Sequence, residues 1–378
     1  MRVGFATTYD SSSVRHWSGT PFFMRTALEQ SGLDVVPIVT EEGRRPSIIG
    51  RKIAYKLAGR RYLSDREPSV LARHARTVDD LSRRANTRLV LSPGTVAVSA
   101  LGPEADFVFW TDATFGGLIG FYPEFSSLCK RSIRDGHRME QRALDQCALA
   151  LYSSEWAART AIDLYGADPS KVHVVPFGAN FASDLAVSEV HEVIDQRPLD
   201  HCELLLVGVD WHRKGGDVAV EIAAELNRRG MPTTLHVVGC DPPASSPDFV
   251  VRHGFISKST PEGMSAMTSL YQRAHFLVLP TRAECFGIVF AEAASFGVPS
   301  MAPRVGGIET AVGEASGGFL AQLDGEPAAY ADFVMATMSG ADVYRSHARR
   351  ARDDYETRLN WPTNGRVVAD LVHATLGD

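Results

Sequence analysis

Short apolar runs alternate with longer amphipathic segments along most of this chain. In the first half, runs rich in aliphatic and aromatic residues predict strands at 2–7, 33–39, 89–91, 107–110, 148–152 and 172–175. A helix containing 22–28 and ending near Gly32 joins the first two runs, which gives a β-α-β unit. Since parallel strands need such crossovers, the pattern predicts a parallel sheet with helices packed on it.

The second half repeats the alternation, with predicted strands at 203–209, 234–238, 249–253 and 275–279. Two successive series of this kind predict an α/β fold with two doubly wound, Rossmann-like domains. The acidic segment 180–201 shows no sustained strand signal and marks the boundary. We therefore expect an N-terminal domain over 1–183 and a C-terminal domain over 200–359.

Residues 280–310 combine two carboxylates with the start of a helix. A buried strand ends at Pro280, a helical pattern begins near Gly287, and Gly297 stands where the helix should stop. Glu284 precedes this helix and Glu292 lies about one turn inside it, on either side of Phe286-Gly287-Ile288. The N–H groups at a helix start suit a phosphate. A carboxylate nearby can accept hydrogen bonds from a vicinal diol such as a ribose, so this stretch indicates a nucleoside diphosphate site.

The stretch also resembles the signature of the family-4 retaining glycosyltransferases, E-x-F-G-x-x-x-x-E followed by G-x-P and a G-G turn. The matching residues are Glu284, Phe286-Gly287, Glu292, Gly297-Val298-Pro299 and Gly306-Gly307. Cys285 departs from the family, which often has proline at this position.

The resemblance covers nearly the whole chain and implies the GT-B architecture, in which two Rossmann-like domains face a cleft. It implies that Glu292 binds the ribose of a nucleotide sugar. Glu284 and the amides of Phe286, Gly287 and Ile288 would hold the donor sugar and its phosphates. It further implies that a C-terminal helix within 360–378 crosses back to complete the N-terminal domain.

A loop with two adjacent cations follows the predicted strand 203–209. It contains Arg213, Lys214 and two glycines, and Asp217 is a plausible N-cap for a helix over 218–229. Cations at this position can stabilise the charge that develops on a departing diphosphate. Lys214-Gly215 matches the family's lysine-glycine pair. The family's usual arginine is Val209 here, so we assign its role to Arg213.

Further candidates follow from position and resemblance. Backbone groups of Phe255 and Ile256 would border the nucleotide base, although Phe255 also fits a core position. Asp112 lies just past the strand 107–110, where the family often has a histidine. It is a candidate for contacting the donor sugar or, alternatively, a cap for the next segment. Gly19 corresponds in place to the family's glycine-containing loop near donor phosphate and acceptor.

Positive charge is concentrated in the first half, although the net charge of the chain is −6. Residues 44–88 carry thirteen Lys or Arg against four acids, and within 44–61 the cations are interleaved with aliphatic side chains. This composition fits peripheral contact with an anionic membrane or capture of an anionic acceptor. It also fits a solvated, arginine-rich helix. The aromatic content of 9% is too low for a stacking platform, which argues against nucleic acid.

The overall composition is that of a soluble enzyme. No apolar run approaches the roughly 18 residues of a membrane span, and the chain starts on a strand rather than a signal peptide. Five scattered cysteines without C-x-x-C spacing fit a reducing cytoplasm. There is no D-x-D signature and no metal-binding histidine spacing. We therefore expect no metal and no cofactor beyond the nucleotide-sugar substrate.

The sequence thus predicts a cytoplasmic, metal-independent retaining glycosyltransferase, at the inner membrane face if the basic stretch binds lipid. Its predicted catalytic residues are Asp112, Arg213, Lys214 and Glu284. The enzyme alternatives are a GT-B nucleotide-sugar epimerase and a sugar phosphorylase. A non-catalytic GT-B binding scaffold is the other alternative. The donor sugar, the base and the acceptor, whether glycan, lipid-linked or small molecule, stay open.

Overall fold

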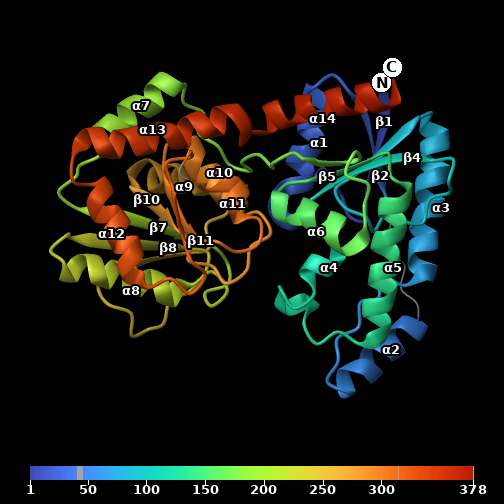
Figure 1. Ribbon diagram of the computed structural model, residues 1–378, viewed down its shortest axis with the longest axis horizontal. Helices are drawn as coiled ribbons and strands as arrows, with labels where there is room; N and C mark the ends of the chain where they lie inside the picture. The colour runs from blue at the N-terminus through green and yellow to red at the C-terminus, as the bar shows by residue number, and fades with distance from the viewer. Residues whose placement is uncertain (41–45, 314, 378) are drawn as a thin grey trace. The chain divides into compact units, whose positions relative to one another are not determined.

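The protein is described here by a computed structural model that covers residues 1–40, 46–313 and 315–377 (Figure 1). The chain divides into two compact units, the first formed by Met1–Val175 together with the chain from Asn364, the second by Pro176–Thr363. Each unit contains one six-stranded sheet whose paired strands all run parallel. The predicted α/β class with two Rossmann-like domains is confirmed.

The sheet of the first unit has the strand order β2-β1-β3-β4-β5-β6. Its strands are β1 (Arg2–Thr7), β2 (Asp34–Val39), β3 (Leu89–Ser92), β4 (Asp106–Thr111), β5 (Leu149–Tyr152) and β6 (Val172–Val174). β3 and β5 are buried at every position, as expected for central strands covered on both faces. These strands agree with the predicted runs to within a residue or two at each end.

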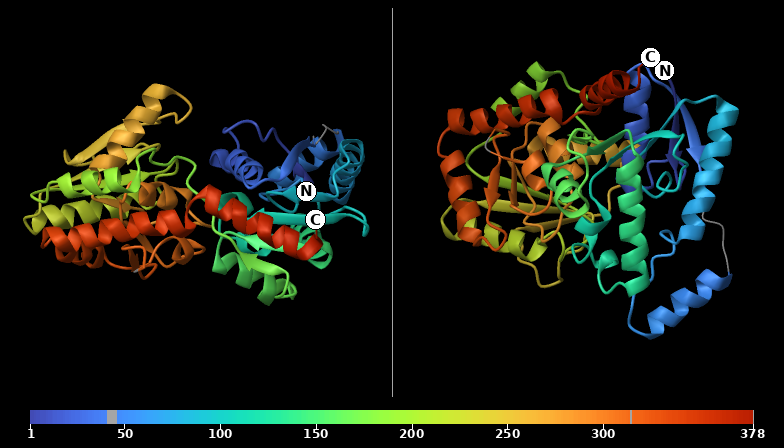
Figure 2. Two further views of the ribbon diagram at one scale, coloured as in Figure 1. Left: turned by 90° about the horizontal axis from the view of Figure 1, so that it is seen from above. Right: turned by 45° about the vertical axis from the view of Figure 1, so that its right-hand side comes forward.

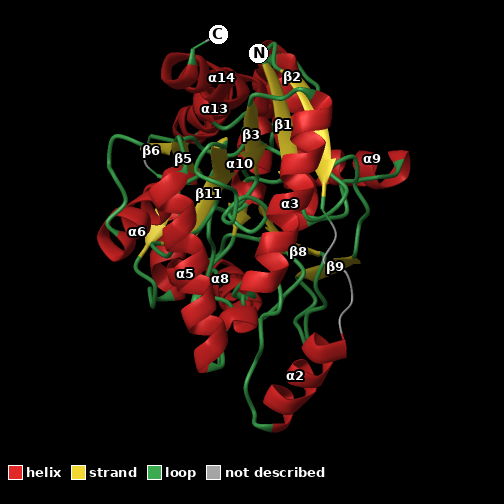
Figure 3. Cartoon of the chain, turned by 90° about the vertical axis from the view of Figure 1, so that its right-hand side faces the viewer, coloured by secondary structure: helices red, strands yellow, loops and turns green. Residues whose placement is uncertain are grey.

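The first unit also contains the helices that pack on this sheet and one helix, α2 (Pro46–Leu57), that stands away from it. They are α1 (Thr20–Gln30), α2 (Pro46–Leu57), α3 (Pro68–Ala85), α4 (Phe115–Leu118), α5 (Lys130–Gln146), α6 (Glu155–Tyr165) and α14 (Trp361–Leu376), with 3-10 turns at Trp17–Gly19 and Pro123–Phe125. Most of the C-terminal helix α14 belongs to the first unit, as the resemblance implied. It packs closely on α1, because a Cβ atom on Gly365 would lie 2.6 Å from the carbonyl oxygen of Ala27. Figure 3 shows α2 standing away from the sheet of this unit.

The sheet of the second unit has the order β12-β11-β10-β7-β8-β9. Its strands are β7 (Cys202–Val207), β8 (Thr233–Val238), β9 (Val250–Gly254), β10 (Phe276–Val278), β11 (Ser300–Pro303) and β12 (Phe319–Ala321). Its helices are α7 (Val187–Gln196), α8 (Gly216–Arg228), α9 (Pro261–Arg273), α10 (Ile288–Ser295), α11 (Ile308–Ala311), α12 (Pro327–Thr337) and α13 (Ala341–Arg358), seen from two further directions in Figure 2. The sequence pattern did not predict β11, β12 or α7.

The boundary between the units lies earlier than the predicted residue 183. Phe177 packs on Phe286 and Trp361 at ring-centroid distances of 5.5 and 5.6 Å. Phe181 stacks on Tyr271 and Phe296. These aromatic contacts attach the segment after Val175 to the second unit. Over the described ranges, no helix combines the length and the apolarity needed to cross a bilayer.

Candidate functional site

The strand order of the second unit reverses direction between β7 and β10. From β7 the chain continues to β8 and β9 on one side, whereas β10, β11 and β12 lie on the other. In doubly wound sheets, ligands bind outside the carboxyl ends of the strands at such a switch point. The loop 208–215 follows β7 and the loop 279–287 follows β10, so the two predicted donor-binding loops both start there.

The two loops bring the predicted cations and the first glutamate together. Lys214 Nζ donates a hydrogen bond to Oε2 of Glu284. Arg213 Nη1 lies 3.4 Å from the same oxygen and donates to the carbonyl oxygen of Ala283 at 3.0 Å. Glu284 and Lys214 are only 8% and 7% exposed, so this charged group is shielded from bulk water. Desolvated, positioned charges of this kind interact more strongly with a ligand than surface charges do.

Backbone and side-chain bonds hold the two loops in register. The carbonyl oxygen of Arg213 accepts from the Arg282 N–H and from Thr281 Oγ1, each at 2.8 Å. Arg282 also forms a two-point ion pair with Asp217, at 2.7 and 3.0 Å. The prediction that Asp217 caps the helix is therefore wrong. Gly215 occupies the N-cap position of α8, and Asp217 lies in the first turn, where Arg282 lowers the pKa of its carboxyl.

Two glycines make this close approach of the loops feasible. Gly215 has a φ of 71°, and a Cβ atom there would lie 1.9 Å from the carbonyl oxygen of Pro280. A Cβ on Gly208 would lie 2.7 Å from Cγ of Lys214, so the stem of Lys214 runs across the end of β7. A side chain at either position would push the cation loop away from Glu284.

The helix α10 starts next to Glu284. Gly287 is its N-cap with a φ of 83°, and a Cβ there would lie 2.5 Å from the ring of Phe290. Phe286 is buried, whereas Ile288 is half-buried at the first helical position. The carbonyl oxygen of Glu284 accepts from the Gly307 N–H at 3.1 Å, which fixes the predicted G-G turn against this loop. The positive end of α10 thus lies beside Lys214 and Arg213, an arrangement suited to an anion.

Glu292 has partners that the sequence did not predict. Its carboxylate is 1% exposed and accepts from Lys258 Nζ at 2.5 and 2.6 Å and from Tyr271 Oη at 3.0 Å. Burial, together with the charge of Glu292, raises the pKa of Tyr271 well above its usual value, so this hydroxyl stays a donor. Lys258 and Tyr271 come from a different loop and helix, and no motif spacing relates them to Glu292.

The loop after β9 places the predicted base-side residues at the surface. Phe255 is 76% exposed, which rules out the alternative that it belongs to the core. Ile256 is half-buried, and Lys258 extends from the same loop to Glu292. An exposed aromatic ring close in sequence to the glutamate's partner is compatible with contact to a base.

In the first unit, Asp112 lies just past β4 and is half-buried. It does not cap α4, because the Thr114 hydroxyl accepts from the Gly117 N–H there at 3.1 Å. Burial raises the pKa of Tyr9 above its usual value, and the charge of Asp112 raises it further. The Tyr9 ring stacks on His16 at 4.9 Å in the loop that leads to Gly19. Asp112 therefore interacts with Tyr9, a residue that the sequence did not single out.

Gly19 is the N-cap of α1, with a φ of 88°. It is buried, so the chain turns tightly there without a side chain to accommodate. Within the described part of the chain, no group of three or more His, Cys, Asp or Glu residues could hold a metal ion.

Comparison with known proteins relates this geometry to a family. Residues 186–339, most of the second unit, match the family model "Glycosyl transferases group 1". The D-inositol 3-phosphate glycosyltransferase of Acidothermus cellulolyticus is 33% identical over 248 residues, 60% of this chain and 54% of the relative. The protein of the same name from Nocardia farcinica is 31% identical over 51% of this chain and 46% of its own length. The chain thus spans about half the length of these curated relatives.

Solved structures match over the full length. Sucrose-phosphate synthase from Thermosynechococcus elongatus superposes with a TM-score of 0.70 at 16% identity, covering 99% of this chain and 98% of the other. Anabaena HepE in complex with UDP gives a TM-score of 0.65 at 16% identity, over 99% and 100% of the two chains. These likenesses show the GT-B fold. The match of the second unit to the glycosyltransferase model and the full-length GT-B likenesses both agree with the resemblance found in the sequence.

Proposed function

We propose that the protein transfers a sugar from a nucleoside diphosphate sugar to an acceptor hydroxyl, with retention of configuration and without a metal ion. The observation that carries this proposal is the meeting of Arg213, Lys214 and Glu284 at the switch point between β7 and β10. Two cations held by one buried carboxylate, next to the start of α10, form a preorganised place for a diphosphate.

The chemistry follows from where charge develops. The bond between the anomeric carbon and the diphosphate oxygen breaks, and a bond from the acceptor oxygen to the same carbon forms on the same face. The acceptor's proton passes to the departing phosphate, so the reaction needs no separate base. Arg213, Lys214 and the first amides of α10 stabilise the departing charge, since donors placed before the reaction begins need no reorganisation during it.

The remaining residues have binding roles in this proposal. Glu292 accepts the hydrogen bonds of the ribose diol, and the loop at Phe255 and Ile256 borders the base. Glu284 positions the sugar while it holds the two cations. For Asp112 and Gly19 of the first unit, the family resemblance implies contacts to donor sugar and phosphate.

The names of the similar proteins suggest substrate classes. HepE was solved with UDP and with UDP-glucose, so a uridine diphosphate sugar is the donor class we propose first. The curated relatives carry inositol 3-phosphate in their names, and a phosphorylated polyol is accordingly the acceptor class we propose.

A panel of nucleotide sugars tests the proposal. The purified protein is incubated with UDP-, GDP- and ADP-sugars, and release of the nucleoside diphosphate is measured with and without candidate acceptors. We expect one donor to be hydrolysed slowly and faster with an acceptor, and NMR of the product should show the donor's anomeric configuration. Sugar 1-phosphate formed only with inorganic phosphate would indicate a phosphorylase. No binding or turnover of any donor by the folded protein would contradict the proposal.

A further inference from the structure

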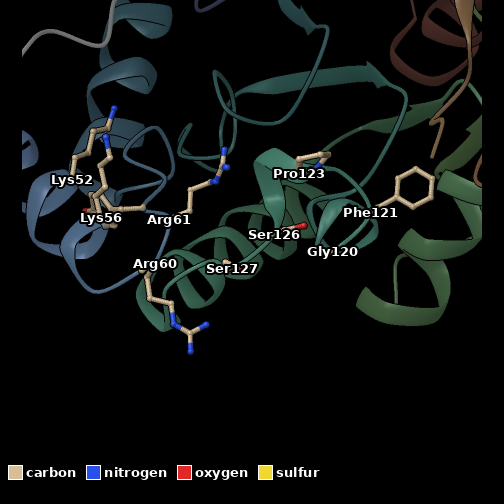
Figure 4. A pocket seen from close by; sticks show the side chains of 11 residues that line it. Lys52, Lys56, Arg60, Arg61, Gly120, Phe121, Pro123, Ser126 and Ser127 are labelled. Carbon is tan, nitrogen blue, oxygen red and sulfur yellow. The ribbon is translucent and has the colours of Figure 1, made fainter. Parts of the chain in front are cut away.

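A pocket lies wholly within the first unit. Its volume is about 710 Å³, within the range of roughly 300–1,000 Å³ typical of small-molecule sites. One wall comes from α2 and the segment after it, and the other from the loop that follows α4 (Figure 4). The lining residues are Lys52, Lys56, Gly59, Arg60, Arg61, Tyr62, Gly120, Phe121, Pro123, Ser126 and Ser127.

The lining is positively charged and includes no acid. Lys52, Lys56, Arg60 and Arg61 all contribute to it. Considering only the residues that the structure describes, none of these four side chains forms an ion pair. In contrast, the neighbouring Arg51 is paired with Glu67 at 2.8 Å. Cations gathered around one concavity, in a chain of net charge −6, create a local field that attracts an anion.

The helix α2, which carries two of these cations, is fixed to the rest of the unit. Arg51 Nη1 donates to both oxygens of Glu67 at 2.8 Å, and the Tyr62 hydroxyl donates to the same carboxylate. The Tyr55 ring stacks on Tyr62 at 5.2 Å. These contacts attach α2 through Arg51 and Tyr55. Lys52 and Lys56, which are one helical turn apart on α2, line the pocket.

The two walls are also joined through their backbones. The Arg61 N–H donates to the carbonyl oxygen of Ser127, and the carbonyl oxygen of Arg61 accepts from the Cys129 N–H, each at 2.9 Å. In Figure 4, Arg61 lies between the α2 lysines and the 120–127 loop, whereas the Arg60 guanidinium extends away from them. The pocket is thus built on a hydrogen-bonded frame rather than on two loose loops. Preorganised donors of this kind bind an anion at a lower entropic cost.

The second wall belongs to the same connection after β4 as Asp112, a predicted catalytic residue. Asp112 follows β4, α4 begins three residues later at Phe115, and the wall residues Gly120–Ser127 follow α4 directly. A ligand held by this wall therefore contacts the same connection that carries Asp112.

We infer that this basic pocket binds a phosphate ester group and that, resting on the proposed function, the group belongs to the acceptor. Lys52, Lys56 and Arg61 supply the charge, and the Ser126 and Ser127 hydroxyls are additional donors on the facing wall. The phosphate can come from a small phosphorylated molecule or from a lipid headgroup. Ile49, Ile53 and Leu57, which are 51%, 57% and 85% exposed on α2, make the second source physically feasible.

Two binding arms separate these sources. In the first, calorimetry compares glucose 6-phosphate with glucose at constant ionic strength. In the second, sedimentation compares phosphatidylglycerol vesicles with phosphatidylcholine vesicles. We expect the wild-type protein to prefer glucose 6-phosphate over glucose, or the anionic phosphatidylglycerol vesicles over the zwitterionic phosphatidylcholine vesicles, or both. Lys52→Gln with Lys56→Gln, and separately Arg61→Gln, should weaken that binding by about tenfold or more.

The matched control is Arg76→Gln with Arg84→Gln, which removes the same charge as the lysine pair from exposed positions of α3. The control variant should bind like the wild type. An equal loss in the control, or no loss in the pocket variants, would overturn the inference. The absence of both preferences, for glucose 6-phosphate over glucose and for phosphatidylglycerol over phosphatidylcholine, would also overturn it. UDP binding is measured on every variant. Pocket variants that keep UDP affinity but lose phosphate affinity support the inference. A wild-type protein that binds phosphate but no nucleotide would defeat the proposed function alone.

Discussion

The ammonium group of Lys258 lies 2.5 and 2.6 Å from the two carboxylate oxygens of Glu292. Glu292 is almost fully buried, so its charge would be costly without this partner. If Glu292 binds a ribose diol, the diol must share the carboxylate with Lys258 or displace it. Lys258 therefore supplies the buried carboxylate with a partner that a donor would have to share or replace.

The first prediction concerns Glu292 itself. Glu292→Gln removes the charge that the diol hydroxyls bind, so nucleotide affinity should fall by about 1.5–3 kcal/mol, roughly ten- to a hundredfold. Calorimetry with the nucleoside diphosphate measures the change.

The control for this prediction is Tyr271→Phe, which deletes one hydrogen bond to Glu292 and leaves the carboxylate in place. It should alter nucleotide affinity far less than Glu292→Gln. Unchanged affinity in a folded Glu292→Gln protein would take this residue out of the donor site.

The second prediction separates binding from catalysis at Lys214. Because its charge should matter most when the diphosphate departs, Lys214→Met should lower kcat and kcat/KM together, by about a hundred- to a thousandfold. Arg228→Gln on the exposed side of α8 removes one cation elsewhere in the same unit and should leave both constants unchanged. A change in the acceptor's KM alone would assign Lys214 another role.

The sequence predicted the residues of the switch-point site that are close to one another in a motif. Glu284, Phe286, Gly287 and Glu292 follow a fixed spacing around one helix start, and Lys214-Gly215 follows one buried strand. Both signals are local, since a strand end, a helix start and the spacing shared with the family signature reveal them. The meeting of Lys214 with Glu284 is the nonlocal step, and the parallel order β10-β7-β8 produces it.

Residues that act through long-range contacts left no such signal. Lys258 and Tyr271 reach Glu292 from a loop and a helix whose patterns are ordinary. The wrong prediction that Asp217 is an N-cap also results from a long-range contact. Asp217 follows a glycine just before a helical pattern, which predicts an N-cap. The ion pair with Arg282, which is distant in sequence, is the contact that its carboxylate makes in the structure. Likewise, the strands β11 and β12 are short, with few residues to show a period.

The third prediction concerns metal dependence. The proposed mechanism stabilises the departing diphosphate with Arg213, Lys214 and the start of α10. EDTA should therefore reduce the steady-state rate by less than about twofold, and added magnesium should not restore a Lys214→Met variant. Complete loss of activity in EDTA, with recovery on adding a divalent cation, would contradict the metal-independent mechanism.

The fourth prediction concerns acid stability and His275. Burial lowers the pKa of this imidazole from 6.5 to about 4. Nδ1 of His275 accepts from the Glu203 N–H at 3.0 Å, and Nε2 donates to the carbonyl oxygen of Pro198 at 2.6 Å, so the neutral ring is the form that fits.

The pKa of His275 is lower in the folded state than in the unfolded state, so the neutral ring stabilises the folded state at pH values above the unfolded-state pKa. This stabilisation is lost as the pH falls toward the folded-state pKa. Between pH 6.5 and 4, the free energy of unfolding of the second unit should drop by up to about 3 kcal/mol through this group. His275→Leu should be less stable at pH 7.5 but should show a shallower pH dependence in this window. Urea unfolding at several pH values measures both, and an unchanged slope in the variant would show that other groups control the acid transition.

The last prediction tests whether the phosphate partner of the basic pocket is a lipid. Of the cations in the predicted stretch 44–61, Arg44 and Arg45 lie outside the described residues, and Arg51 is occupied by Glu67. The informative change is therefore to the apolar side of α2. Ile49, Ile53 and Leu57 recur every four residues and are exposed, so they form a stripe on this helix.

If α2 lies on an anionic bilayer, this stripe enters the interface, and each side chain contributes about 1 kcal/mol of apolar burial. Replacing all three by Ser should lower partitioning onto phosphatidylglycerol vesicles by roughly a hundredfold and leave the affinity for glucose 6-phosphate unchanged. Leu164→Ser, at a 55% exposed position on α6, is the control and should sediment like the wild type. If the wild-type protein does not sediment with these vesicles even at low salt, α2 is a solvated helix that shapes the pocket, and the acceptor is a small phosphorylated molecule.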